Sequence, residues 1–202
     1  MTAASPPPDW LATTLASDAT DGEGVLPTFI RPLSPAMRVV AQASTVTVTR
    51  DDALSFREAT DRGPASGTVL VVGGASGSRR ACMGGLVARE ILVKGFDAVV
   101  TDGLVRDAAE IRRTGLGVWC RGVCPIASQK RGGGQVGGGV LIGDVLVHDG
   151  DWIVADEDGI VVWPRERYEE LLGRAETRLA SDRERERALD AELAHRAGAR
   201  AG

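Results

Sequence analysis

The chain has 202 residues, of which 43% are hydrophobic, and its formal net charge at pH 7 is −4. This length and composition allow one domain with a sizeable core. The sequence lacks a basic stretch interleaved with aromatic residues, so it does not indicate a groove that binds nucleic acid. The opening residues 1–8 are polar and proline-rich and resemble neither a secretory signal nor a membrane span, so the sequence predicts a cytoplasmic protein.

Three cysteines, Cys82, Cys120 and Cys124, are too few for a disulfide framework in a chain of this size, which fits a reducing compartment. The spacing of the last two is one residue too long for a redox or zinc-binding pair. We therefore predict three free thiols that lie either in the core or near the surface.

Residues 1–16 are predicted to be a mobile N-terminal lead-in, and an α/β domain is expected over residues 17–164. The first strands of this domain are predicted at residues 38–41 and 45–49. The alternation of Thr with Val in the second stretch is typical of a strand with one face exposed to water.

The first strand–turn–helix unit of the domain begins with the apolar, β-branched residues 68–72. A glycine-rich turn follows, which lacks the lysine of a P-loop and the spacing of a dinucleotide fingerprint. The next helix is predicted over residues 85–94, with Leu86, Ile91 and Leu92 facing the core.

A second unit follows directly, with a strand at residues 98–101, a turn at Asp102-Gly103 and a helix that begins near Asp107. Two such units in succession predict parallel strands, and ligands bind beyond the carboxyl ends of such strands, where helix N-termini present free N–H groups. Both Gly84-Gly85-Leu86-Val87 and Arg106-Asp107 lie in this position. The sequence therefore predicts a functional site there.

The C-terminal half of the domain changes pattern after a glycine-dense loop at residues 132–139. Short strands separated by aspartate-rich turns predict an antiparallel portion. The short strands are expected at residues 140–142, 145–148, 152–155 and 160–163.

A long C-terminal helix with a polar tail is predicted over residues 165–202. The helix begins just after Pro164, because proline is common at the first turn of a helix.

Arg106 and Asp107 have two interpretations. Asp107 followed by Glu110 matches a capping box for a helix over residues 108–113, and Arg106 could pair with a surface carboxylate. Alternatively, an ionised carboxylate at a helix N-terminus can hold a hard divalent cation whose other ligands are water and substrate oxygens. An adjacent guanidinium can then stabilise a carboxylate or a developing enolate.

Four segments of the chain, taken together, resemble a known family. They are residues 81–88, 94–107, 122–125 and 150–162, and their order is similar to that in the RraA-like family. The resemblance extends from about residue 11 to residue 164. This family contains regulators of ribonuclease E activity and the divalent-metal-dependent 4-hydroxy-4-methyl-2-oxoglutarate aldolases, which also decarboxylate oxaloacetate.

The resemblance implies an α/β fold, a swivelling β/β/α-type domain with a parallel portion and an antiparallel β portion, to which the long C-terminal helix is attached. It also implies a homo-oligomer, either a trimeric ring or a pair of rings that forms a hexamer, with sites near the subunit boundaries. A small 2-oxo acid would be the substrate, and neither a membrane nor a nucleic acid is expected as a partner.

The resemblance also implies roles for the candidate site residues. In the aldolases of the family, the aspartate at the position of Asp107 holds Mg²⁺ or Mn²⁺, and the arginine at the position of Arg106 contacts the substrate and stabilises the enolate. Backbone N–H groups of the segment that matches Gly84-Gly85-Leu86-Val87 bind the carboxylate of the pyruvoyl part. The expected activity is that of a lyase that works through a pyruvate enolate.

Gly85 departs from the pattern of the family. The characterised aldolases carry an acidic residue at this position, and its carboxylate helps to hold a metal-bound water. Nothing in the sequence shows which residue would replace it. The Arg106-Asp107 pair therefore favours a metal-dependent aldolase or decarboxylase, whereas Gly85 favours a non-catalytic regulator that binds a ribonuclease or another protein.

Overall fold

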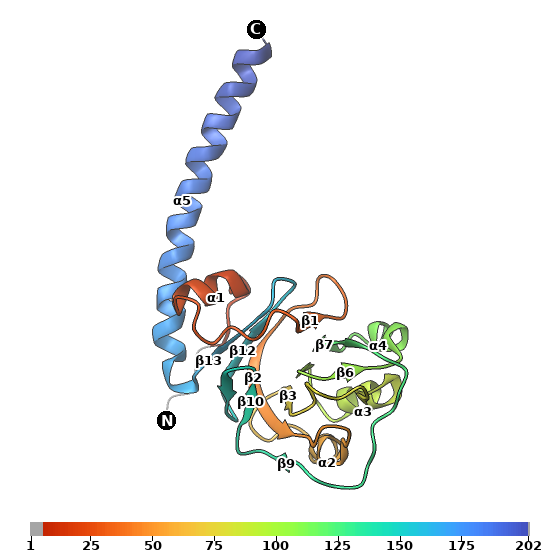
Figure 1. Cartoon of the computed structure of the whole chain (residues 1–202). Helices are drawn as coiled ribbons and strands as arrows, with labels where there is room; N and C mark the ends of the chain where they lie inside the picture. Colours follow the sequence, from red (N-terminus) through yellow and green to blue (C-terminus); the bar gives the residue numbers. More distant parts are fainter. Residues whose placement is uncertain (1–5, 202) are drawn as a thin grey trace.

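A main sheet runs through the body of the protein (Figure 1). The structure is a computed structural model that describes residues 6–201, with side chains described over residues 6–197. The strand order in the sheet is β1-β7-β5-β3-β2-β12-β13, and β9 pairs with β2 beside this path. These strands are β1 (Arg31–Pro32), β2 (Val39–Thr47), β3 (Val69–Gly73), β5 (Ala98–Thr101), β7 (Gly117–Cys120), β9 (Gln135–Val136), β12 (Trp152–Ala155) and β13 (Ile160–Trp163).

The centre of the sheet is parallel, as the two strand–turn–helix units predicted. Strand β3 pairs in parallel with β2 on one side and with β5 on the other, and β5 pairs in parallel with β7. All five residues of β3 are buried. An uninterrupted apolar run is typical of a strand covered on both faces.

The antiparallel portion continues the same sheet. Strand β2 pairs with β12 antiparallel, with Val40 opposite Val154, while Val71 of β3 lies opposite Thr45 further along β2. The prediction of two separate strands at residues 38–41 and 45–49 was wrong, because one long strand joins the two portions. The hairpin of β10 (Val140–Ile142) and β11 (Val145–Val147) forms a small sheet of its own.

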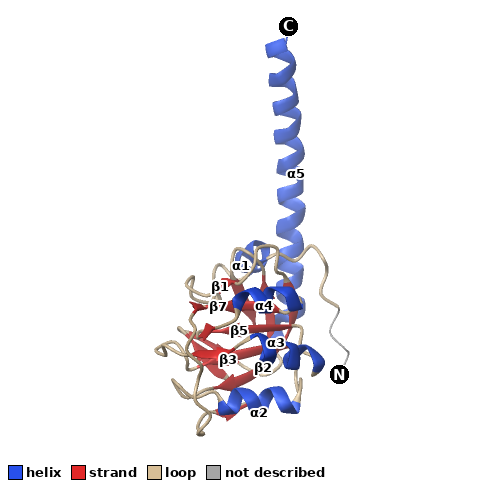
Figure 2. Cartoon of the chain, turned by 90° about the vertical axis from the view of Figure 1, so that its right-hand side faces the viewer, coloured by secondary structure: helices blue, strands red, loops and turns tan. Residues whose placement is uncertain are grey.

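Three helices cover one face of the sheet (Figure 2). They are α2 (Leu54–Arg62), α3 (Gly85–Val93) and α4 (Ala108–Thr114), and their buried residues, including Phe56, Ile91 and Ile111, share a core with the sheet. Leu86 was expected to face this core but is 69% exposed, because α3 turns Ala88 and Ile91 toward the sheet instead.

Two further helices pack against the edge of the sheet that β12 and β13 form. Helix α5 (Tyr168–Ala201) follows a short 3₁₀ turn at Arg165–Arg167 and then projects away from the body, with α1 (Thr13–Ala19) beside its first turns (Figure 1). Tyr168 stacks on Trp152 with ring centroids 4.2 Å apart. Among the described residues, no helix combines the length and the apolar character needed to cross a bilayer.

The N-terminal segment is packed where it enters α1. Leu11, Leu15 and Ala16 are buried together with residues of α5, although they belong to the predicted mobile lead-in. These side chains cover the apolar strip that the sheet edge and α5 form, which explains why the segment is held. The domain boundaries at residues 16 and 164 stay a prediction.

The first turns of α5 are expected to contribute strongly to stability. Leu171 is fully buried, so Leu171→Ala should lower the free energy of unfolding by roughly 2–5 kcal/mol through lost apolar contact and the cavity left behind. Leu193 lies on the same helix but is 63% exposed, so Leu193→Ala should have little effect. Urea unfolding of both variants tests this difference, and equal losses would contradict the packing.

The cysteines are free thiols, as predicted. Burial raises the pKa of Cys82 to about 12 and also raises the pKa of Cys120. The reactive form is the thiolate. We therefore expect iodoacetamide at pH 8 to modify Cys124, which is partly exposed, well before the other two. Peptide mass spectrometry after timed alkylation measures this order, and rapid modification of Cys82 in the folded protein would contradict it.

Candidate active site at the start of helix α3

A small parallel sheet brings the two predicted site segments together. It consists of β4 (Ala81–Met83), β6 (Leu104–Val105) and β8 (Gly122–Val123). Strand β4 leads into Gly84 and α3, strand β6 leads into Arg106 and α4, and the Arg106 N–H donates to the Met83 carbonyl at 3.0 Å. Sequence reasoning missed this sheet, because strands of two or three residues carry no detectable period.

The Asp107 carboxylate binds the neighbouring helix rather than its own. Asp107 precedes α4 with a left-handed backbone (φ 56°, ψ 39°), and its side chain makes no capping hydrogen bond to α4. Instead its Oδ2 accepts the Gly85 N–H at 3.2 Å. The capping-box interpretation is therefore wrong for this side chain. A left-handed backbone is tolerated by Asp but costs of order 1 kcal/mol, and such strain clusters at functional sites.

Arg106 extends across the same point. Its Nε lies 3.6 Å from Asp107 Oδ2, and the two side chains are 44% and 46% exposed, so both reach solvent. A Cβ on Gly84 would lie 2.5 Å from Asp107 Oδ2 and 3.0 Å from the Arg106 side chain. The missing side chain at Gly84 is thus what allows the acid and the guanidinium to approach the start of α3.

The first turn of α3 offers hydrogen-bond donors beside this pair. The first helical bond runs from the Ala88 N–H to the Gly84 carbonyl at 3.0 Å, so the N–H groups of Gly85, Leu86 and Val87 come before it. Asp107 accepts the first of these, and the next two belong to the helix turn whose N–H groups generally bind anions. The structure therefore places all six predicted site residues together.

Gly84→Ala is expected to disrupt this site without unfolding the protein. The added methyl group would push Asp107 and Arg106 off the start of α3, whereas a Cβ on Gly77 would meet nothing within 4 Å. For the 2-oxo acid lyase activity that the sequence resemblance implies, we expect a loss of at least about tenfold in kcat/KM, because a small misplacement of positioned groups is costly. Steady-state kinetics with Gly77→Ala as control measures this, and unchanged kcat/KM in Gly84→Ala would contradict it.

The donor set fits a hard divalent cation. Carboxylate oxygens suit Mg²⁺ and Mn²⁺, and Mg²⁺ is usually held by one or two carboxylates while water and substrate supply its other ligands. Asp107 is half exposed and offers such an oxygen. Within the part of the chain that the structure describes, no group of three or more His, Cys, Asp or Glu side chains is arranged to hold a metal ion.

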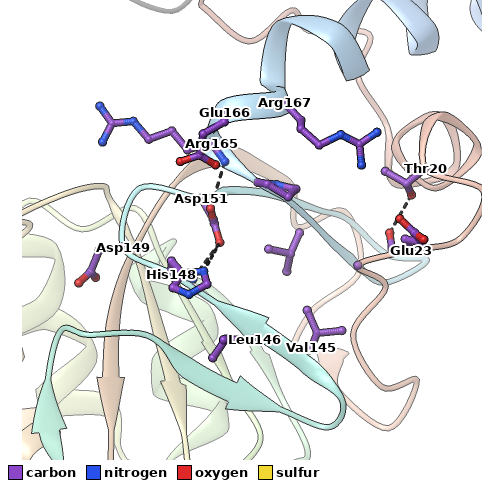
Figure 3. Close-up of a pocket in the computed structure, with 13 residues that line it drawn as sticks. Thr20, Glu23, Val145, Leu146, His148, Asp149, Asp151, Arg165, Glu166 and Arg167 are labelled. Atoms are coloured by element: carbon purple, nitrogen blue, oxygen red, sulfur yellow. Dashed lines mark hydrogen bonds and ion pairs between the residues drawn. The ribbon is translucent and has the colours of Figure 1, made fainter.

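A cavity lies away from these residues, near β11 and the start of α5 (Figure 3). Its volume is about 640 Å³. The buried Asp151 carboxylate in its wall already accepts the N–H groups of His148 at 2.8 Å and of Arg165 at 3.0 Å. This carboxylate therefore holds a turn, and none of the six predicted site residues lines the cavity.

Comparison with known proteins places the chain in a family. A model described as RraA-like, Aldolase/RraA, matches residues 13–162. A protein of Halalkalibacterium halodurans, provisionally named 4-hydroxy-4-methyl-2-oxoglutarate aldolase, is 35% identical over 179 residues, which cover 89% of this chain and 85% of that protein. A protein of Alkalilimnicola ehrlichii with the same provisional name is 36% identical over 150 residues, covering 74% and 92%.

Two solved structures share the fold. The RNA-processing inhibitor RraA from Thermus thermophilis superposes with a TM-score of 0.68 at 32% identity, covering 76% of this chain and 93% of that one. RraAS2 of Streptomyces coelicolor, described as an unusual member of the RNase ES inhibitor RraA protein family, gives 0.70 at 25% identity, covering 91% and 98%. The chain therefore belongs to the RraA-like family, as the order of its four sequence segments predicted.

Proposed function

We propose that this protein is a divalent-metal-dependent lyase that acts on small 2-oxo acids, of the 4-hydroxy-4-methyl-2-oxoglutarate aldolase and oxaloacetate decarboxylase type. The observation that carries this proposal is the Asp107 carboxylate, which turns away from its own helix onto the start of α3 beside Arg106. The provisional names of the curated relatives support a lyase.

Each side of the site has a role in this proposal. A Mg²⁺ or Mn²⁺ ion held by Asp107 would supply Lewis-acid polarisation of the 2-oxo acid. The N–H groups of Leu86 and Val87 bind the substrate carboxylate at the helix N-terminus. The Arg106 guanidinium stabilises the negative charge that develops as the carbon–carbon bond breaks. Aldol cleavage and loss of CO₂ both leave a pyruvate enolate, so one site serves both reactions.

An oligomer is part of the proposal. Leu86 and Val93 lie seven residues apart on α3 and are 69% and 86% exposed, which leaves apolar side chains in water next to the site. Exposed apolar patches commonly mark interaction surfaces. We propose that a second copy of the chain covers this face in a trimer or hexamer. Light scattering should then give three or six times the chain mass of 21.2 kDa.

Pyruvate release tests the activity. The purified protein with Mg²⁺ or Mn²⁺ should release pyruvate from oxaloacetate faster than the spontaneous reaction, a chelator should stop this, and added metal should restore it. The spontaneous rate is measured at the same metal concentration, because free divalent cations also promote decarboxylation. A rate equal to that background at saturating metal would contradict the proposal.

The second candidate is a non-catalytic regulator that binds a ribonuclease or another protein. Gly85, which has no acidic side chain, and the likeness to the Thermus RNA-processing inhibitor favour it. Affinity purification from the extract of its own cells separates the two functions. A stoichiometric protein partner together with no pyruvate release would support the regulator.

A further inference from the structure

Glu110 of α4 occupies the space in which a side chain at Gly85 would lie. A Cβ built on Gly85 would clash with the carboxylate group of Glu110. The Glu110 side chain is 38% exposed, so its carboxylate lies at the surface beside the start of α3 rather than in the core. Two consecutive glycines thus each make room for an acid of the α4 segment, Gly84 for Asp107 and Gly85 for Glu110.

The backbone at the start of α4 explains this placement. The Asp107 carbonyl accepts the Glu110 N–H at 2.9 Å and the Ile111 N–H at 3.0 Å, which closes the first turn without help from either side chain. In a capping box, the Glu110 side chain would return to its own helix. Here it crosses to α3, the helix that packs against α4.

Each acid at this point has an arginine beside it. Arg106 lies next to Asp107, and Arg89 Nη2 is 3.1 Å from Glu110 Oε1. The arginines reduce the repulsion between two carboxylates held at one helix start. A pair of carboxylates there, with solvent on the open side, is a donor set of the kind that hard cations take.

We propose that Glu110 is the second carboxylate of the cation site and that it supplies, from α4, the acidic group that Gly85 lacks. This inference rests on the proposed metal-dependent function. In this role the Glu110 carboxylate would bind the cation, either directly or through a water molecule, and would hold the cation beside Asp107. The competing explanation is that Glu110 serves only the ion pair with Arg89 and holds α3 to α4.

Binding of Mn²⁺ to the full chain, measured by electron paramagnetic resonance of the free ion, tests the proposal independently of activity. Glu110→Gln keeps the size and an acceptor for Arg89 but removes the charge. We expect it to weaken Mn²⁺ binding by roughly 10- to 100-fold, the usual effect of losing a supporting metal-site residue. Glu90→Gln is the matched control, since Glu90 is a 34% exposed acid of α3 paired with Arg57 at 3.1 Å.

Two further variants separate the two explanations. Arg89→Gln breaks the same ion pair but leaves the Glu110 carboxylate, so Mn²⁺ affinity should not fall. In Glu110→Ala the space next to Gly85 is vacated, so adding Gly85→Asp should bring a carboxylate back and restore most of the lost affinity. The thermal unfolding temperature of every variant is measured to check that its fold is intact.

The outcomes are distinct. Weakened binding in Glu110→Gln alone, with rescue by Gly85→Asp in the Glu110→Ala background, supports the proposal. If Glu110→Gln binds Mn²⁺ unchanged while Asp107→Asn loses Mn²⁺, the role of Glu110 is overturned and the proposed function stands. Equal losses of Mn²⁺ affinity in Glu110→Gln and Arg89→Gln also overturn the role of Glu110. A wild-type chain that does not bind Mn²⁺ overturns both.

Discussion

Asp107→Asn should reduce metal-dependent decarboxylation of oxaloacetate by about 1000-fold or more. In the wild type, the Asp107 carboxylate accepts the Gly85 N–H at 3.2 Å. The amide of the variant keeps an oxygen that can accept the same N–H, so the local structure should persist. The substitution removes the negative charge that would hold the cation in the proposed site. Lewis-acid stabilisation contributes several kcal/mol, and each 1.36 kcal/mol is a factor of ten in rate. Steady-state kinetics of pyruvate release at saturating Mg²⁺ measures the loss.

Asp61→Asn is the control for this variant. Asp61 is also an exposed acid beside an arginine, with Arg57 Nε at 3.1 Å, but it lies on α2 away from the site. Its substitution should leave the rate within about twofold, because exposed ion pairs contribute little. If Asp107→Asn were as active as Asp61→Asn, the carboxylate would not be part of the reaction.

Arg106→Lys should lower kcat by about 100- to 1000-fold while Mn²⁺ binding is retained. Lysine keeps the charge but lacks the planar, two-pronged donor that a carboxylate or an enolate oxygen accepts. This expected decrease in kcat equals the usual effect of removing one hydrogen-bond donor that stabilises a developing oxyanion. The combination of kinetics with a metal titration matters, because it separates loss of charge stabilisation from loss of the cation.

Arg113→Lys serves as the matched control for Arg106. Arg113 lies on the same helix α4, and its Nε donates to the Ala109 carbonyl of that helix at 3.0 Å. We expect no change in kcat for it. A kcat of Arg106→Lys equal to that of Arg113→Lys would remove Arg106 from the proposed chemistry.

The parallel centre of the fold could be predicted from the sequence because its signals are local. Strand β3 is a continuous apolar run, and helices α3 and α4 begin where Gly84-Gly85 and Asp107 place them. Leu86 was assigned to the wrong face because a nine-residue helix with apolar residues on several sides has no unique buried stripe. The first buried residues after Gly85 are Ala88 and Ile91.

The candidate site itself was only partly predictable. The neighbourhood of Gly84-Gly85 and Arg106-Asp107 followed from the rule for parallel strands, but the direction of the Asp107 side chain did not. That direction depends on a left-handed backbone at Asp107, which sequence pattern does not reveal. The position of Glu110 over Gly85 depends on how α3 packs against α4, a contact between residues 25 positions apart.

The most direct test of the central claim is a crystal structure of the protein grown with Mg²⁺ and oxalate, a stable mimic of the pyruvate enolate. We expect the ion bound by Asp107 and chelated by oxalate, with one oxalate carboxylate at the N–H groups of Leu86 and Val87 and with Arg106 in contact. If Asp107 still accepts only the Gly85 N–H and neither Mg²⁺ nor oxalate is bound beside it, the proposed lyase mechanism is wrong.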